Sequence, residues 1–194
     1  IAMGTGAVDL NGTGTLNVDS GGFLFSGTGT STLDGFTGIA VGPVTNEYVF
    51  HVVSGTATVS SALSTLTARL TKSGVGTLIL TATNTGLGDV TLNEGVLQIS
   101  DLDNIGGSTG ALIFAGGTLR LDASGYSGDD ISTRTITLLP GGGTLDTNGN
   151  NLTFDNAVGA GSTGGCTKAG AGVLTLNAAV GYTVTTTISG GTLM

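Results

Sequence analysis

Hydrophobic residues in this chain occur singly or in pairs, separated by Thr, Gly, Ser and Asn. Leu78 and Leu80 lie two positions apart, and Leu119 and Leu121 repeat the spacing. Side chains two positions apart share one face of a β-strand, so this alternation predicts short strands with one buried face. Glu, Lys, Gln, Arg and Met are scarce, whereas β-branched Thr and Val are abundant, which favours strands over helices. No apolar run reaches the ~20 residues of a membrane-spanning helix. We therefore predict an all-β segment without a membrane span.

A ten-residue block occurs twice with the same internal spacing. Residues 71–80 read TKSGVGTLIL, and residues 167–176 read TKAGAGVLTL. In each copy a later Gly-x-Leu triplet begins 23 positions after the lysine. The positions that repeat are Lys72, Gly74, Gly76, Leu78, Gly95 and Leu97 in the first copy, and Lys168, Gly170, Gly172, Leu174, Gly191 and Leu193 in the second. Self-similarity at a fixed period is typical of solenoids, in which each unit buries its apolar face against its neighbours.

This repetition predicts a parallel β-helix of roughly nine coils, since about 22 residues form one turn of such a solenoid. We expect residues 1–194 to form a single β-helical segment, with degenerate coils over 1–66 and regular repeats over 67–194. A β-sandwich is the alternative, and Asn-Gly hairpin turns would favour it. Such pairs occur at residues 11–12 and 148–149, but the strands around them are short and the period is regular.

The charge balance narrows the classes of partner. Thirteen acidic residues against five basic ones give a net charge of −8. Nucleic-acid binding needs clustered Lys and Arg to neutralise phosphates, and Arg69 with Lys72 is the nearest approach to such a cluster. We therefore predict no nucleic-acid partner.

The two lysine blocks and the Gly-x-Leu triplets that follow them resemble the autotransporter-associated β-strand repeat of type V secreted proteins from Gram-negative bacteria. The match is best over residues 70–100 and 134–194. The resemblance implies a right-handed parallel β-helix at the cell surface or released from it, with turn glycines, inward leucines and no catalytic residues. Residues 84–86 (Asn-Thr-Gly) depart from the family pattern, which usually has an aromatic residue after the asparagine.

Two pairs of carboxylates are the strongest candidates for chemistry. Asp101 and Asp103 would project from one face of a strand, a geometry usable for acid–base work or for calcium. Asp129 and Asp130, followed by Arg134, form the second pair. Both pairs also lie in polar, glycine-containing stretches where Asp caps turns through its own backbone. We favour the turn-capping interpretation and predict no metal or cofactor site.

His51 and Cys166 occur without partners in the sequence. His51 alternates with Phe50 on an apolar strand, so it is expected to face solvent or to form a structural hydrogen bond. Cys166 follows two glycines, and a nucleophilic thiol would want a nearby histidine. We expect Cys166 to be a small filler at a turn or at the start of a strand.

The repeated lysines and the threonine-rich stretches have alternative interpretations. The spacing of Lys72 and Lys168 indicates a structural role at equivalent corners of the solenoid, by bonding to carbonyls of the adjacent turn; a shared ligand-binding role is the alternative. Threonine-rich stretches such as residues 185–187 are compatible with a role in binding ice or a crystalline glycan. That role generally requires threonines in register on every coil, and along this sequence we expect the threonines to drift out of register.

Together these patterns favour a structural and adhesive stalk of a bacterial surface or secreted protein, rather than an enzyme. We expect it to be a segment of a longer polypeptide that is anchored in the outer membrane through another part. The expected partners are a glycan or protein of a host or neighbouring cell, or a second copy of the chain. A polysaccharide-active lyase or hydrolase on the same scaffold is the alternative.

Overall fold

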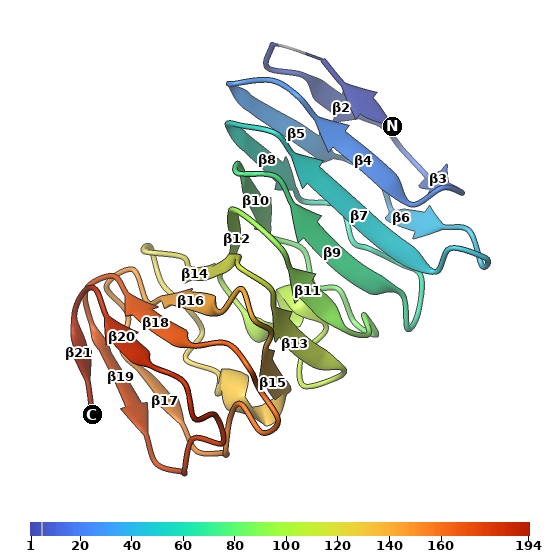
Figure 1. Ribbon diagram of the computed structural model, residues 1–194. Helices are drawn as coiled ribbons and strands as arrows, with labels where there is room; N and C mark the ends of the chain where they lie inside the picture. Colours follow the sequence, from blue (N-terminus) through green and yellow to red (C-terminus); the bar gives the residue numbers. More distant parts are fainter. Residues whose placement is uncertain (5) are drawn as a thin grey trace.

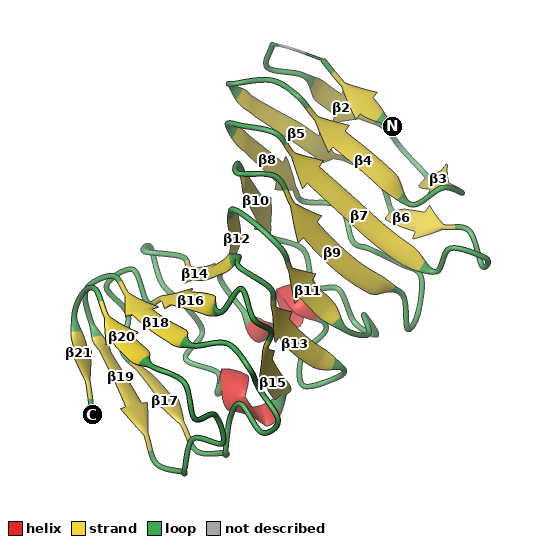
Figure 2. Cartoon of the chain, in the orientation of Figure 1, coloured by secondary structure: helices red, strands yellow, loops and turns green. Residues whose placement is uncertain are grey.

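The short alternating segments form parallel strands that stack into a β-solenoid of about nine turns (Figures 1 and 2). This computed structural model describes residues 1–4 and 6–194. The molecule is elongated, with the N-terminal strands at one end and the C-terminal strands at the other (Figure 1). The predicted all-β parallel helix of roughly nine coils is confirmed.

Each coil contributes one strand to a nine-stranded sheet. In spatial order the strands are β2 (Asp9–Asn11), β5 (Thr30–Asp34), β8 (Thr56–Val59), β10 (Thr77–Leu80), β12 (Val96–Ile99), β14 (Thr118–Leu121), β16 (Gly143–Asp146), β18 (Cys166–Ala169) and β20 (Thr186–Ile188). Successive strands pair without slippage: Leu78 is opposite Leu97, and Leu97 is opposite Leu119. Stacked leucines therefore form a continuous inner column.

A seven-stranded sheet forms a second side. Its strands are β1 (Ala2–Met3), β4 (Gly22–Phe25), β7 (Glu47–Val52), β9 (Arg69–Ser73), β11 (Val90–Leu92), β13 (Ala111–Phe114) and β15 (Thr135–Leu138). After β15 the described residues continue this side as an isolated parallel bridge between Val158 and Val180.

The third side varies along the solenoid. Its elements are β3 (Thr15–Val18), β6 (Gly38–Val41), the 3₁₀ helices η1 (Leu102–Ile105) and η2 (Ile131–Thr133), and the three-stranded sheet β17 (Leu152–Phe154), β19 (Val173–Leu176) and β21 (Thr192–Leu193). The three-stranded sheet begins in the coil where the seven-stranded sheet ends. The cross-section of the solenoid therefore changes between its N-terminal and C-terminal coils.

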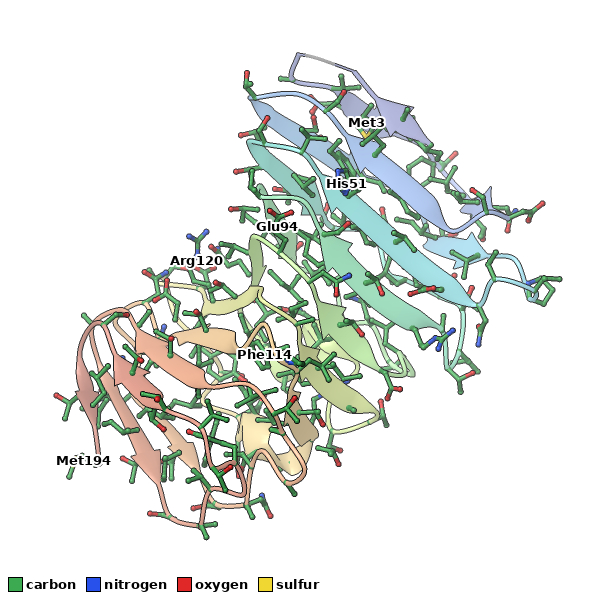
Figure 3. All side chains as sticks on the ribbon, in the orientation of Figure 1. Met3, His51, Glu94, Phe114, Arg120 and Met194 are labelled. Carbon is green, nitrogen blue, oxygen red and sulfur yellow. The ribbon has the colours of Figure 1, made fainter. Side chains whose placement is uncertain are left out.

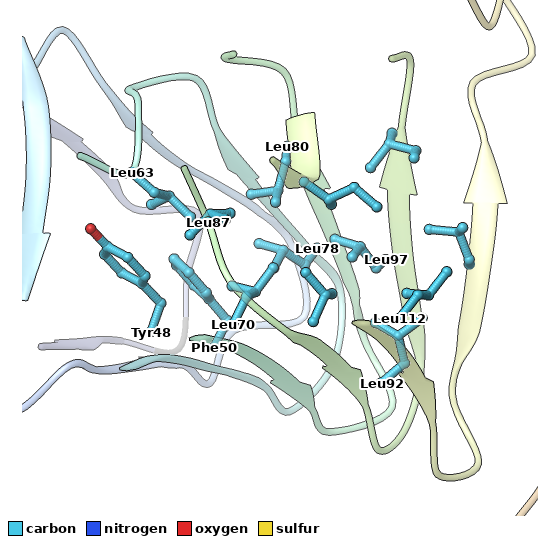
Figure 4. Close-up of a cluster of buried hydrophobic side chains, with 14 of the residues drawn as sticks. Tyr48, Phe50, Leu63, Leu70, Leu78, Leu80, Leu87, Leu92, Leu97 and Leu112 are labelled. Atoms are coloured by element: carbon cyan, nitrogen blue, oxygen red, sulfur yellow. The ribbon is translucent and has the colours of Figure 1, made fainter. Parts of the chain in front are cut away.

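The core is a file of leucines and aromatic rings between the sheets (Figure 4). Phe50 is fully buried and stacks on Phe23 with a centroid distance of 4.6 Å. Tyr48 is buried too, and its hydroxyl donates to the Ile39 carbonyl (2.7 Å) and accepts from the Thr65 amide (2.9 Å). The most deeply buried aromatic side chains therefore lie in the N-terminal coils, which the sequence indicated to be less regular.

Candidate functional site

Lys72 projects into the core of the solenoid. It lies on β9, between Phe50 of the preceding strand and Leu92 of the following one, and its side chain is 0% exposed. Its Nζ donates to the carbonyl oxygens of Ser73 (2.8 Å) and Gly74 (2.6 Å) in its own coil and of Glu94 (3.1 Å) in the next. A buried ammonium is tolerated only when its donors are satisfied, and here backbone oxygens do so.

Lys168 repeats this arrangement atom for atom. It is also 0% exposed, and its Nζ donates to the carbonyls of Ala169 (2.8 Å), Gly170 (2.8 Å) and Gly190 (3.1 Å). In both copies the acceptors are the first, second and twenty-second residues after the lysine. We call each arrangement a lysine clamp, because one side chain joins the corners of two successive coils.

The glycines of the repeated block shape these corners. Gly74 has φ +74° and Gly170 has φ +73°, a left-handed conformation that residues with a Cβ rarely adopt. A Cβ on Gly95 would meet the carbonyls of Gly74 and Gly76 in the coil below, so Gly95 permits close stacking. The corner carbonyls can therefore converge on the ammonium.

The two clamps lie on different sides of the solenoid. Lys72 belongs to the seven-stranded sheet, whereas Lys168 on β18 belongs to the nine-stranded sheet, opposite Leu145. The expectation that both lysines occupy equivalent corners is therefore wrong. The first block forms β9 and β10, in the seven- and nine-stranded sheets, whereas the second forms β18 and β19, in the nine- and three-stranded sheets. Local geometry is conserved between the copies, whereas position around the axis is not.

Burial perturbs both ammonium groups. Desolvation lowers the pKa of Lys72 from 10.5 to about 8, and the charge of Glu94 opposes this shift. Desolvation also lowers the pKa of Lys168, with Asp146 opposing it. Since neither side chain is exposed, neither can reach a ligand, and the geometry supports a structural role.

Arg134 is a third buried cation. It is 1% exposed and donates through Nη1 to the carbonyls of Ile105 and Gly107 (both 2.9 Å), and through Nη2 to those of Gly88 (3.0 Å) and Ala111 (3.2 Å). Burial lowers its pKa to about 10, and Asp89 opposes this shift. The alternative in which Arg134 serves a site with Asp129 and Asp130 is therefore not supported, because its guanidinium is buried on backbone carbonyls.

The alternation of inward and outward side chains along a strand could have identified Arg134 as a buried residue. Arg134 precedes Ile136 and Leu138 by two and four positions, so its side chain shares their inward face. The same alternation relates Leu70 to Lys72.

Two buried asparagines, Asn84 and Asn104, link the coils on the third side. Asn84 accepts from the Leu63 amide (2.7 Å) and donates to the Asn104 carbonyl (2.5 Å). Asn104 in turn donates to the Ala82 carbonyl (3.1 Å) and accepts from the amide of Ser100 (3.0 Å). The corner at Asn84 is thus held by its amide group.

The structure brings the two carboxylate pairs together. Asp101, Asp103, Asp129 and Asp130 line one open groove, and the described residues that line it include no lysine, arginine or histidine. Asp101 caps η1 by accepting from the Asp103 amide (2.7 Å), and Asp130 caps η2 by accepting from the Ser132 amide (2.8 Å). These two carboxylates therefore serve as turn caps. Among the described residues, no group of three His, Cys, Asp or Glu side chains is arranged to hold a metal ion.

Comparison with known proteins places both lysine clamps in one family. The family model of the passenger-associated-transport-repeat matches residues 70–99 and 167–194, which contain Lys72 and Lys168. Over 186 residues, or 86% of its length, the chain is 34% identical to the adhesin BmaC autotransporter of Brucella suis biovar 1 (strain 1330). The chain is an autotransporter passenger segment. It spans 5% of the length of that adhesin. No solved structure matches it.

The lone histidine and cysteine of the passenger segment lie where the sequence predicted. His51 is exposed on the outer face of β7 (Figure 3), and its Nδ1 is 2.9 Å from the Ser73 hydroxyl. Cys166 is the first residue of β18 and is partly buried, and burial raises the pKa of its thiol. Within the described part of the chain, neither belongs to a group of three His, Cys, Asp or Glu side chains that could hold a metal ion. No described helix is long and apolar enough to cross a membrane.

The outer face of the nine-stranded sheet carries a feature that the sequence analysis missed. One outward position of eight consecutive strands is in register, and seven of its eight residues are threonines. This threonine row consists of Thr30, Thr56, Thr77, Thr118, Thr144, Thr167 and Thr187, with Val96 in the fourth place. The expectation that the threonines drift is therefore wrong for this sheet. The signal was present, because Thr77, Thr118 and Thr144 each occupy the middle of a Gly-x-Leu triplet.

Proposed function

We propose that the passenger segment is a structural and adhesive module, a β-solenoid stalk that carries binding surfaces at the outside of a bacterial cell. It is exposed at the surface or secreted, and held to the outer membrane by another part of a longer polypeptide. It performs no catalysis.

The unbroken nine-stranded ladder is the observation that carries this proposal. Stacked coils leave few unpaired backbone groups along the sides of the rod, and this suits an extracellular stalk that must resist unfolding and proteolysis. The lysine clamps and Arg134 add cross-links between successive coils, since each cation holds carbonyls from at least two of them. The similarity to a bacterial adhesin supports the adhesive part.

The acidic groove does not favour the enzymatic alternative. Two of its carboxylates cap 3₁₀ helices, and Asp129 accepts from the Ser127 hydroxyl (2.7 Å). A site for an anionic polysaccharide would need positive charge to hold the substrate, and the groove presents none.

Two measurements test the stalk. Negative-stain images of the purified segment are expected to show short rods, and compact globules would contradict the proposed architecture. Beads coated with the folded segment are expected to attach to epithelial cells more than beads coated with the Leu78→Asp variant. That variant has nearly the same composition, but it buries a carboxylate in the leucine column and should unfold the coil. Equal attachment would contradict the adhesive role.

Turnover assays test the absence of catalysis. Incubation with neutral and anionic polysaccharides is expected to release no reducing ends and no unsaturated products. Turnover that is lost on Asp101→Asn, Asp103→Asn, Asp129→Asn or Asp130→Asn would establish an enzyme and overturn the proposal.

A further inference from the structure

The threonine row is a continuous strip of uncharged hydrogen-bonding groups along the solenoid. Neighbouring strands in a sheet lie about 4.8 Å apart, so eight in-register positions extend over about 34 Å. From β5 to β18 each member of the row is followed by a buried residue, as Thr77 is by Leu78, so its side chain faces outward; Thr187 on β20 is itself exposed. The row therefore presents one hydroxyl per coil, with a single gap at Val96.

These hydroxyls are free to bind a ligand. Elsewhere threonine hydroxyls bond to the chain itself: Thr71 donates to Glu47 (2.6 Å), and Thr147 donates to the Ala171 carbonyl (2.6 Å). Within the described residues, no hydrogen bond joins a hydroxyl of the threonine row to another protein group. Each can therefore donate one hydrogen bond and accept others from a molecule laid along the row.

The surroundings of the row are uncharged over its middle strands. The adjacent outward positions on β8, β10 and β12 are Thr58, Ile79 and Gln98, in register with one another. Charged side chains occupy this column at Asp9 on β2, before the middle strands, and at Arg120 and Asp146 after them (Arg120 is labelled in Figure 3). Methyl and hydroxyl groups thus alternate on a neutral strip, in a chain whose net charge of −8 repels polyanions.

From this geometry we propose that the threonine row binds a single uncharged polysaccharide chain that runs along the solenoid axis. Sugar hydroxyls both donate and accept, as threonine hydroxyls do, and the C–H faces of sugar rings match the threonine methyls. The strands turn in direction along the nine-stranded sheet (Figure 1), so a flat lattice such as ice or a crystalline glycan cannot contact the whole row. A flexible single chain can follow the turn. This proposal rests on the adhesive function, for which it names the class of ligand.

Nuclear magnetic resonance titration of the threonine methyl groups tests the proposal. The probes are cellohexaose, chitohexaose and laminarihexaose as uncharged ligands, and hexagalacturonate as an anionic one. At least one uncharged hexasaccharide is expected to shift the methyl signals of the threonine row, and hexagalacturonate is expected to shift none. The variant Thr77→Val/Thr118→Val/Thr144→Val should weaken binding at least tenfold, because it removes three hydroxyls but keeps a β-branched side chain. The matched control, Thr91→Val/Thr137→Val, changes outward threonines of the seven-stranded sheet and should bind normally.

Several outcomes would overturn the proposal. These are no shift with any uncharged hexasaccharide, equal shifts on both sheets, and binding of hexagalacturonate alone. Sedimentation showing a dimer that the triple variant abolishes, without sugar binding, would assign the row to a second copy of the chain. Failure of this proposal can be distinguished from failure of the proposed adhesive function. If beads coated with the triple variant attach to epithelial cells as well as beads coated with wild type, the threonine row is not the binding surface, but the adhesive role stands.

Discussion

Lys72 and Lys168 hold their ammonium groups on carbonyls at identical relative positions, although they belong to different sheets of the solenoid. The clamp is thus a local device made by one lysine, the corner glycine two residues later and the next coil. It works on whichever side of the rod the block falls. This explains how one short motif can recur in a solenoid whose cross-section changes.

Replacing Lys72 with methionine should destabilise the segment. Methionine fills most of the space but leaves three corner carbonyls without their donor, and the gain from no longer burying a charge offsets only part of the loss. We expect the free energy of unfolding in urea to fall by about 2 kcal/mol. Arg69→Met, on the exposed face of the same strand, should change it by less than about 0.5 kcal/mol. Equal stability of K72M and wild type would show that the clamp is dispensable.

The corner glycine should be more sensitive to substitution than a glycine in open space. A Cβ on Gly74 would face strain at φ +74° and would also meet the Val52 carbonyl of the preceding coil. Gly14 has a similar φ of +89° but no atom within 4 Å of an added Cβ. Gly14→Ala should cost about 1 kcal/mol, the price of a left-handed conformation alone. We expect Gly74→Ala to cost at least twice as much by urea denaturation, and similar costs would contradict the close approach.

The stability of the segment should depend on pH through Lys72. Its pKa is about 8 in the folded chain and 10.5 in the unfolded chain, so between these values the unfolded state binds more protons. The free energy of unfolding therefore rises with pH in that window, because the buried amine sheds its charge while still donating hydrogen bonds. Between pH 7 and pH 9.5, wild type should gain about 2 kcal/mol relative to K72M. If wild type instead loses stability relative to K72M on alkalinisation, the pKa is not lowered.

The thiol of Cys166 should react slowly in the folded chain. Burial raises its pKa, so the thiolate fraction at pH 8 is smaller than in an unfolded peptide. We expect iodoacetamide to alkylate the folded segment at least tenfold more slowly than the urea-unfolded segment, as followed by mass spectrometry. Rapid alkylation of the folded chain would indicate an activated nucleophile and would reopen the question of catalysis.

Alternation and glycine spacing were sufficient to predict the coils. Leu78, Leu80, Leu97 and Leu119 repeat at two-residue and coil-length intervals, and both periods follow from local geometry: side chains alternate along a strand, and glycine permits the left-handed corner. The same alternation along each strand could have predicted the inward side chain of Arg134 and the outward row that includes Thr77 and Thr118. The identity of the repeat likewise came from residues close together in the chain.

The tertiary structure alone established how the coils stack around the axis. Lys168 lies in another sheet from Lys72 because the second block falls on a different side of its coil, although the nine-stranded sheet itself continues in register. That Asp101 and Asp129 share a groove, and that seven threonines align, depends on which residues of successive coils stack on one another. In a solenoid each coil docks on its neighbour through side chains and hydrogen bonds between residues far apart in sequence, and coil lengths differ, so spacing along the chain does not give these positions.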